Sequence, residues 1–321
     1  MSALLSPATD LLDELRQLFP FELDDFQIRA IQVLAAGESV VVCAPTGSGK
    51  TLIGEYAIYR ALSQGKRVFY TTPLKALSNQ KFRDFGQQFG PERVGLLTGD
   101  ISINRDAPVL VMTTEIFRNM LYGTPISLAV QRYAYGERDD GTEFSEGEVD
   151  PLRDVQAVIL DECHYMNDQQ RGTVWEEAII YCPPTIQLIA LSATLANSDQ
   201  LTDWMNQVHG PTHLIDSNHR PVPLQFHFAN RKGLFPLLEQ TESGQWVCNR
   251  RLKSKLPKSG QSSYGGVPDM VQVVENLRQR DMLPAIYFIF SRKGCDLAVA
   301  SVGNLDLIAS EEERQQLAEQ I

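Results

Sequence analysis

The chain has 321 residues, of which 43% are hydrophobic, so it can form a sizeable core and, at roughly 150 residues a domain, about two domains. Its formal net charge of −11 argues against a protein that coats nucleic acid by bulk electrostatic attraction. No apolar run reaches the roughly 18 residues of a membrane span, and the N-terminus lacks a secretory signal, so we expect a cytoplasmic protein without a membrane partner. The five cysteines form no CxxC pair and predict neither disulfides nor a zinc site.

The first predicted element is a helix within residues 1–18. Ser6 is a suitable cap, with Pro7 in the first turn, and leucines follow at helical spacing. The next predicted helix carries Gln27, whose amide has the donor and the acceptor needed to pair with the edge of adenine. Phe21 could stack on the same base, although spacing alone predicts that Gln27 is a surface helix residue.

A glycine-rich loop follows an apolar run at 39–43 and leads into another helical pattern. It reads Ala44-Pro45-Thr46-Gly47-Ser48-Gly49-Lys50-Thr51. A triphosphate needs several N–H donors at close range, and glycines let the backbone approach it where a Cβ would collide. Lys50 can reach the terminal phosphates and the Thr51 hydroxyl can coordinate Mg²⁺, while the helix N-terminus adds partial positive charge. The pattern predicts a phosphate-binding loop, with Ala44 where the general motif has glycine.

Short β-rich runs then alternate with helical patterns, which predicts βαβ units and an α/β fold with a mainly parallel sheet. The runs are 67–71, 94–97, 109–113, 155–160 and 187–191. Polar or small clusters follow them at 71–73, 98–100, 113–115, 161–164 and 192–194. Because open α/β sheets bind ligands beyond the carboxyl ends of their strands, these clusters are expected to share one functional edge.

Two stretches of opposite charge interrupt this pattern. Residues 137–150 hold seven acidic residues and one arginine, within a polar stretch that predicts a surface insertion at about 123–150. Residues 231–258 hold seven basic residues and two glutamates, in a region where we expect a small β element followed by a linker. Beyond the linker, the sequence predicts a helix at 270–279 and a buried strand at 283–290.

A second chemical anchor is the tetrad Asp161-Glu162-Cys163-His164, which follows an apolar run. A carboxylate at a strand end beside a phosphate loop can hold Mg²⁺, directly or through water. A neighbouring carboxylate can orient and deprotonate the water that attacks the γ-phosphate. An Asp-Glu pair alone is common on protein surfaces, but its position after an apolar strand and downstream of the phosphate loop favours a catalytic role.

These motifs resemble those of superfamily 2 helicases of the DExH-box class, in order along nearly the whole chain. They are Gln27, the loop ending Gly49-Lys50-Thr51, the segment 71–77, Thr98-Gly99-Asp100, Thr113-Thr114-Glu115, the tetrad and Ser192-Ala193-Thr194. Helicases of this class often have alanine at the position of Ala44. Within the class, the chain is similar to the superkiller-type, exosome-associated RNA helicases at 74–81, 112–122, 167–172, 175–177 and 220–224.

The resemblance implies a RecA-like P-loop NTPase domain and a role for each motif. ATP would be bound by Phe21, Gln27, Thr46, Gly47, Ser48, Gly49, Lys50 and Thr51, with Mg²⁺ held by Thr51 and Asp161. The catalytic residues would be Lys50, Asp161 and Glu162. One RNA strand, along which such motors usually move 3′ to 5′, would follow a path lined by Pro73, Lys75, Thr98, Gly99, Thr113 and Thr114. Nucleotide state would be coupled to strand binding by His164, Ser192 and Thr194.

The resemblance also implies a second RecA-like domain, whose arginines reach the γ-phosphate from the opposite side. Residues 288–296 match only the first motif of that domain, so we expect a C-terminally truncated chain. Because arginine fingers are worth roughly 10³ to 10⁵ in rate, we expect this chain alone to bind ATP and to hydrolyse it slowly. The implied layout is an N-terminal helix at 1–18, a first RecA-like ATP-binding domain at 19–215, a β element and basic linker at 216–266, and the beginning of a second RecA-like domain at 267–321.

The leading hypothesis is an ATP-dependent RNA helicase that couples ATP hydrolysis to translocation on RNA and to its unwinding, in RNA processing or decay. Its ligands and partners would be ATP, Mg²⁺, single-stranded or tailed RNA, and RNA-processing or decay proteins. Two alternatives stay open: an ATP-dependent RNA-binding module without unwinding activity, and a DNA helicase with a similar motor. Contacts to the 2′-hydroxyl would separate RNA from DNA, and the motifs alone do not.

Overall fold

The computed structural model describes residues 18–122, 151–193, 197–241, 244–253, 268–303, 305, 307–308 and 310–318. The predicted N-terminal helix, apart from its last residue, and the predicted acidic insertion lie outside these ranges. The chain divides into two compact units, Met1–Val222 and Pro223–Ile321.

The first unit is built on an eight-stranded sheet in the order β4-β3-β5-β2-β6-β7-β1-β8. Neighbouring strands are parallel except β3 and β4, which confirms the predicted α/β fold with a mainly parallel sheet. The sequence pattern does not predict β4, which is short and exposed, or β8, which is only partly buried. The strands are β1 (Ser39–Cys43), β2 (Arg67–Thr72), β3 (Val94–Leu97), β4 (Ser102–Ile103), β5 (Val109–Thr113), β6 (Val155–Leu160), β7 (Gln187–Ser192) and β8 (Thr212–Asp216).

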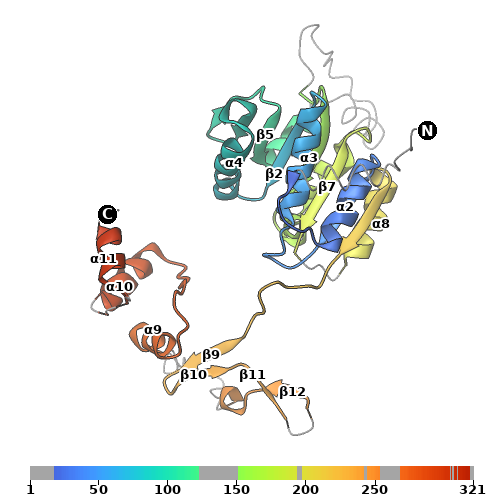
Figure 1. Cartoon of the computed structure of the whole chain (residues 1–321). Coiled ribbons are helices and arrows are strands. Elements are labelled where there is room, and N and C mark those ends of the chain that lie inside the picture. The colour runs from blue at the N-terminus through green and yellow to red at the C-terminus, as the bar shows by residue number, and fades with distance from the viewer. Residues whose placement is uncertain are drawn as a thin grey trace, which may run out of the picture. The chain divides into compact units, whose positions relative to one another are not determined.

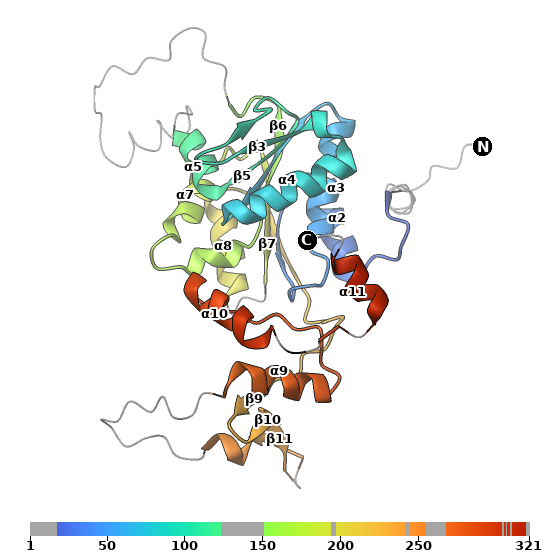
Figure 2. The same ribbon diagram turned by 90° about the vertical axis from the view of Figure 1, so that its left-hand side faces the viewer.

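Helices cover both faces of this sheet (Figure 1). One core lies under α2 (Asp25–Ala35), α3 (Thr51–Ser63) and α4 (Lys75–Phe89). The other lies under α5 (Thr114–Tyr122), α7 (Thr173–Tyr181) and α8 (Ser198–Val208), which Figure 2 shows stacked along the left of the sheet. Short 3₁₀ turns form at η1 (Pro91–Arg93) and η2 (Cys163–Asn167).

Strand β1 illustrates why the strands read as continuous apolar runs. Val40 and Val42 face the first core, whereas Val41 and Cys43 face the second, and every residue of the strand is buried. A strand covered on both faces needs apolar side chains at every position, so its sequence does not alternate.

The carboxyl ends of the parallel strands meet along one edge of the sheet. The backbone N–H of Ala44 donates to the carbonyl of Ser192 at 3.2 Å, which joins the residue after β1 to the end of β7. The N–H of Asp161 donates to the carbonyl of Thr71 at 3.0 Å, which joins the residue after β6 to β2. The polar clusters predicted after these strands therefore do share one edge.

The described residues of the second unit form two small antiparallel ribbons and three α-helices. The ribbons pair β9 (His227–Asn230) with β10 (Gly233–Pro236), and β11 (Leu238–Gln240) with β12 (Trp246–Cys248). A 3₁₀ turn, η3 (Arg250–Lys253), follows β12, and α9 (Met270–Gln279) covers the residues of the predicted helix. The other helices are α10 (Arg292–Val302) and α11 (Glu311–Ala318).

The predicted buried strand at 283–290 is wrong for this structure. These residues form no strand, and the side chains of Ile286 and Phe288 are 83% and 80% exposed. An extended segment becomes a stable strand only when a neighbouring strand satisfies its backbone groups, and within the described ranges no strand pairs with this one. Of the helices in those ranges, none is long and apolar enough to cross a membrane.

Candidate functional site

The phosphate loop connects β1 to α3 and depends on two glycines. Gly47 and Gly49 have φ angles of +83° and +82°, a region that glycine adopts readily and other residues avoid. A Cβ on Gly49 would also lie 2.8 Å from Nε2 of Gln27, whereas a Cβ on Gly47 would have no neighbour within 4 Å. The loop therefore needs glycine at position 47 for backbone conformation, and at position 49 for both conformation and space.

Lys50 folds back over this loop. Its ammonium donates to the carbonyl oxygens of Ala44 at 2.7 Å and Pro45 at 3.0 Å. Burial lowers the pKa of Lys50, while the nearby carboxylates of Glu162 and Asp161 act in the opposite direction. The lysine thus lies where the phosphate loop and the acidic pair meet. Its ammonium donates to two neutral carbonyl oxygens, and phosphate oxygens could take their place as acceptors.

Gln27 lies against the loop, and its side chain is only 5% exposed, so the interpretation from spacing alone as a surface residue is wrong. Its Nε2 donates to the carbonyl of Gly49 at 3.1 Å, and its Oε1 accepts from the N–H of Asp24 at 2.9 Å. The amide retains a second N–H and a second lone pair, which is what adenine pairing requires. Phe21 is 58% exposed, with its ring 6.0 Å from that of Phe19, and so presents a face on which a base can stack.

The acidic pair follows β6 directly. Asp161 accepts from the hydroxyl of Tyr70 at Oδ2 (2.6 Å) and from the backbone N–H of Glu162 at Oδ1 (2.9 Å). Glu162 has the left-handed backbone conformation (φ 53°, ψ 43°), which is uncommon outside glycine, asparagine and aspartate. Strained residues of this kind cluster at functional sites, where the strain aims a side chain.

The residues predicted to couple nucleotide state to strand binding lie at the ends of β6 and β7 as far as the structure describes them. Nδ1 of His164 is 3.2 Å from Oε2 of Glu162, although it lacks hydrogen-bond geometry to any partner among the described residues. Ser192 is the last residue of β7 and is fully buried, and its hydroxyl has no hydrogen-bond partner among the described residues. Thr194 lies outside the described residues.

The loop and the acidic pair fit a magnesium nucleotide chemically. Mg²⁺ prefers oxygen ligands, usually keeps several waters, and takes one or two protein oxygens together with substrate phosphates. Thr51 and Asp161 offer a hydroxyl and a carboxylate, and the buried hydroxyl of Ser48 has no partner in the loop. Among the described residues there is no cluster of three histidine, cysteine or acidic side chains that could hold a metal ion.

A second group of predicted residues meets beyond β2 and β3. Nζ of Lys75 lies 2.9 Å from Oδ1 of Asp100, and the hydroxyl of Thr98 donates to the same oxygen at 3.0 Å. The hydrogen bonds from Lys75 and then Thr98 lower the pKa of the Asp100 carboxyl. Lys75 and Gly99 are exposed, so this part of the predicted nucleic-acid path can be reached from solvent.

The remaining path residues are more enclosed. Pro73, Thr113 and Thr114 are buried, and the hydroxyl of Thr114 donates to the carbonyl of Thr72 at 3.2 Å. Arg171 connects this group, since its Nη2 donates to the carbonyl of Pro73 at 2.7 Å and its guanidinium pairs with Glu115. Sequence reasoning assigned no role to Arg171 or Asp100, although both lie inside motifs that carry the resemblance.

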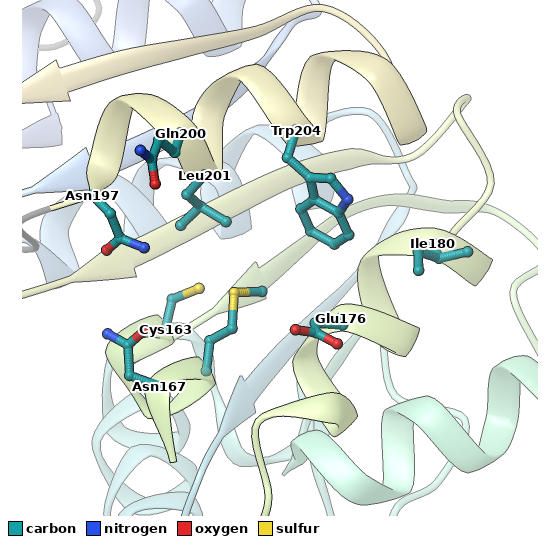
Figure 3. Close-up of a pocket in the computed structure, with 9 residues that line it drawn as sticks. Cys163, Asn167, Glu176, Ile180, Asn197, Gln200, Leu201 and Trp204 are labelled. Atoms are coloured by element: carbon teal, nitrogen blue, oxygen red, sulfur yellow. The ribbon is translucent and has the colours of Figure 1, made fainter. Parts of the chain in front are cut away.

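A pocket of about 400 Å³ lies between η2, α7 and α8, and does not contain the phosphate loop (Figure 3). Trp204 projects into it opposite Glu176, with Met166 and Leu201 among the apolar side chains. It touches the acidic tetrad through Cys163 alone.

An α/β domain with a phosphate loop after β1 and an acidic pair after β6 is typical of P-loop nucleotide-binding proteins. The family model described as DEAD/DEAH box helicase matches residues 24–201. The chain belongs to this helicase family, whose members use ATP.

Individual relatives cover both units of the chain. The DExH-box ATP-dependent RNA helicase DExH15 of Arabidopsis thaliana, a chloroplastic protein, is 42% identical over 92% of this chain and 27% of its own length. The probable helicase HelY of Mycobacterium tuberculosis is 41% identical over 97% of this chain and 34% of its own length. The crystal structure of the DUF1998 helicase MrfA is 16% identical, with a TM-score of 0.55 over 98% of this chain and 44% of that one, a likeness of fold alone. The chain spans about a third or less of the length of these curated relatives.

Proposed function

We propose that this chain is the ATP-binding part of an ATP-dependent RNA helicase of the superkiller type, acting in RNA processing or decay. The observation that carries the proposal is the meeting of three predicted groups on one edge of one sheet. The phosphate loop, the acidic pair and the group of Lys75, Thr98 and Asp100 all follow the carboxyl ends of parallel strands of one sheet, β1, β6, β2 and β3. Hydrolysis can change strand binding only if the nucleotide site and the strand site are energetically coupled.

In this proposal the chain's own residues divide the nucleotide chemistry. The glycine loop supplies N–H donors to the phosphates, and Lys50 exchanges the carbonyls of Ala44 and Pro45 for phosphate oxygens. Thr51 and Asp161 would hold Mg²⁺, which would neutralise the charge that develops on the phosphates. Glu162, which follows Asp161 directly, would take the proton of the attacking water.

Strand binding is proposed along Pro73, Lys75, Thr98, Gly99, Thr113 and Thr114. Lys75 and Gly99 are the exposed members, so Lys75 supplies the charged contact to phosphate and the others position the backbone. Contacts of this kind carry little sequence information, which suits a protein that moves along its substrate. His164, Ser192 and Thr194 would relay nucleotide state to this path.

RNA is proposed as the substrate because the Arabidopsis relative is named as an RNA helicase and shares 42% of aligned residues with the chain. The name of the mycobacterial relative specifies no nucleic acid, so a DNA helicase is the competing reading. The proposed layout keeps a first RecA-like domain at 19–215, a β element and linker at 216–266, and the beginning of a second RecA-like domain at 267–321.

The test is a pair of binding titrations with fluorescent single-stranded RNA and DNA of the same sequence, followed by anisotropy over a range of salt. We expect the chain to bind RNA more tightly, and Lys75→Ala to weaken binding and to reduce the salt slope by about one phosphate contact. Lys66→Ala is a matched control, because Lys66 forms an exposed ion pair of the same 2.9 Å length with Asp154 but precedes β2, at the opposite end of that strand.

Each other outcome identifies a different error. Equal or tighter binding of DNA would favour the DNA helicase. Equal effects of Lys66→Ala and Lys75→Ala would mean that binding follows general charge and not the proposed path. No binding of either strand by a folded chain would remove the helicase proposal for this chain.

A further inference from the structure

Tyr70, on β2, lies beside the acidic pair without being part of any motif assigned above. It is fully buried, and its hydroxyl donates to Oδ2 of Asp161 at 2.6 Å. Asp161 is one of the two residues proposed to hold Mg²⁺, so a buried hydroxyl holds one of the proposed metal ligands.

The Tyr70 ring is fixed by its surroundings. The ring of Phe85 meets it edge-on, with centroids 4.9 Å apart and planes at 68°. On the α3 side, a Cβ on Gly54 would come within 3.1 Å of the ring atom Cε2, so the helix backbone lies close to the ring. A side chain packed in this way has little freedom, and its hydroxyl therefore occupies a defined position.

The Asp161 carboxylate is held at both of its oxygens. One oxygen accepts from the Tyr70 hydroxyl. The other oxygen of Asp161 accepts from the N–H of Glu162, so both oxygens of this carboxylate are oriented by the chain itself.

Lys81 links Tyr70 to the other proposed metal ligand. From α4, its ammonium donates to Oγ1 of Thr51 at 3.1 Å and lies 5.6 Å from the centre of the Tyr70 ring. The side chains of Asp161, Tyr70, Lys81 and Thr51 therefore form one continuous set of contacts, and Tyr70 is its fully buried member. Connected networks in a low-dielectric interior hold their members more firmly than isolated pairs do.

We propose that Tyr70 is a positioning residue for Mg²⁺, whose hydroxyl fixes the Asp161 carboxylate before the metal nucleotide binds. The inference rests on the proposed function, since it assumes that Asp161 is a metal ligand. Mg²⁺ demands near-ideal octahedral geometry, so a carboxylate with a fixed orientation is a better ligand than one that rotates freely. Residues that orient metal ligands typically contribute 10- to 100-fold to metal affinity.

The test compares the binding of a fluorescent ADP analogue with Mg²⁺ and with EDTA, in the wild type and in Tyr70→Phe. The dissociation constant in EDTA divided by the dissociation constant in Mg²⁺ measures how much the metal strengthens binding. This ratio is independent of folding and of contacts to the nucleotide alone. We expect Tyr70→Phe to lower this ratio about 10-fold while binding in EDTA changes less than about 2-fold. The half-saturating Mg²⁺ concentration should rise by a similar factor.

Tyr122→Phe is the matched control. The hydroxyl of Tyr122 also donates to a carboxylate oxygen at 2.6 Å, that of Glu177, but it lies on α5, on the opposite face of the sheet. It should leave the ratio unchanged. Tyr70→Phe keeps the ring that packs against Phe85 and Gly54, and circular dichroism and thermal unfolding of all three proteins establish that they fold.

The outcomes separate the inference from the proposed function. An unchanged ratio in a folded Tyr70→Phe protein, including a loss that is equal with Mg²⁺ and with EDTA, would overturn the positioning role. An equal fall of the ratio in Tyr122→Phe would overturn it too, by showing a general effect. A wild type whose nucleotide binding ignores Mg²⁺ would instead contradict the proposed metal site itself.

Discussion

Replacing Gly49 by alanine changes both features for which the phosphate loop needs glycine at this position, the left-handed backbone conformation and the space beside Gln27. Alanine in the left-handed region at φ +82° costs about 1 to 2 kcal/mol. The new Cβ would also lie 2.8 Å from Nε2 of Gln27, so the buried amide must move away from the Gly49 carbonyl and lose a hydrogen bond worth about 1 kcal/mol. The binding-competent loop should then become less favourable by about 2 to 3 kcal/mol, which weakens nucleotide binding roughly 30- to 150-fold.

Gly47→Ala is the internal reference for this prediction. Gly47 has nearly the same φ, +83°, but a Cβ there meets no atom within 4 Å, so only the backbone cost of about 1 to 2 kcal/mol applies. We expect a loss of roughly 5- to 30-fold. Titration of a fluorescent ADP analogue gives both dissociation constants, and urea unfolding confirms that the domain remains folded.

The contact with Gln27 can be isolated by a double-mutant cycle. In a Gln27→Ala background, Gly49→Ala should cost no more than Gly47→Ala, because the amide that the Cβ displaces has been removed. Equal losses for Gly47→Ala and Gly49→Ala in the wild-type background would refute the reasoning. So would a Gly49→Ala cost that is unaffected by removal of Gln27.

Two further substitutions test the acidic pair and the strand path. Glu162→Gln should preserve ATP binding and slow hydrolysis by roughly 10²- to 10⁴-fold in a form of the protein that hydrolyses ATP, as measured by phosphate release; loss of binding instead would indicate a structural role. Arg171→Ala removes the donor to the Pro73 carbonyl and leaves the half-buried Glu115 without its partner, so urea unfolding should show a loss of about 1 to 3 kcal/mol together with weaker RNA binding. Unchanged RNA binding by the folded variant would contradict a role for Arg171 in shaping the path.

Much of the fold of the first unit could be predicted because its signals are local. The alternation of apolar runs with helical patterns predicted a mainly parallel sheet, and the continuous burial of Val40 to Cys43 shows that the sheet is covered on both faces. The phosphate loop is recognisable because glycine, lysine and threonine must stand at fixed spacing for one chemical task. Signals of this kind depend on neighbours in the sequence.

Features that depend on distant partners were not predictable in the same way. Gln27 has surface-helix spacing, and only the approach of the loop makes it a buried contact of Gly49. Tyr70 has the pattern of an ordinary strand aromatic, and only the fold brings Asp161 to its hydroxyl. The apolar run at 283–290 illustrates the converse, since a strong local strand signal forms no strand where the described residues offer no neighbour.

The central claim, that Ala44 to Thr51 is a nucleotide site, is tested most directly by calorimetric titration of the chain with a non-hydrolysable ATP analogue and Mg²⁺. We predict saturable binding at one site, weakened roughly 10- to 150-fold by Lys50→Ala, because a charged hydrogen bond to phosphate is worth about 1.5 to 3 kcal/mol. Lys66→Ala is the control, because Lys66 pairs with Asp154, and this variant should bind the analogue as the wild type does. Absence of binding by the folded wild type, or equal binding by Lys50→Ala, would contradict the claim.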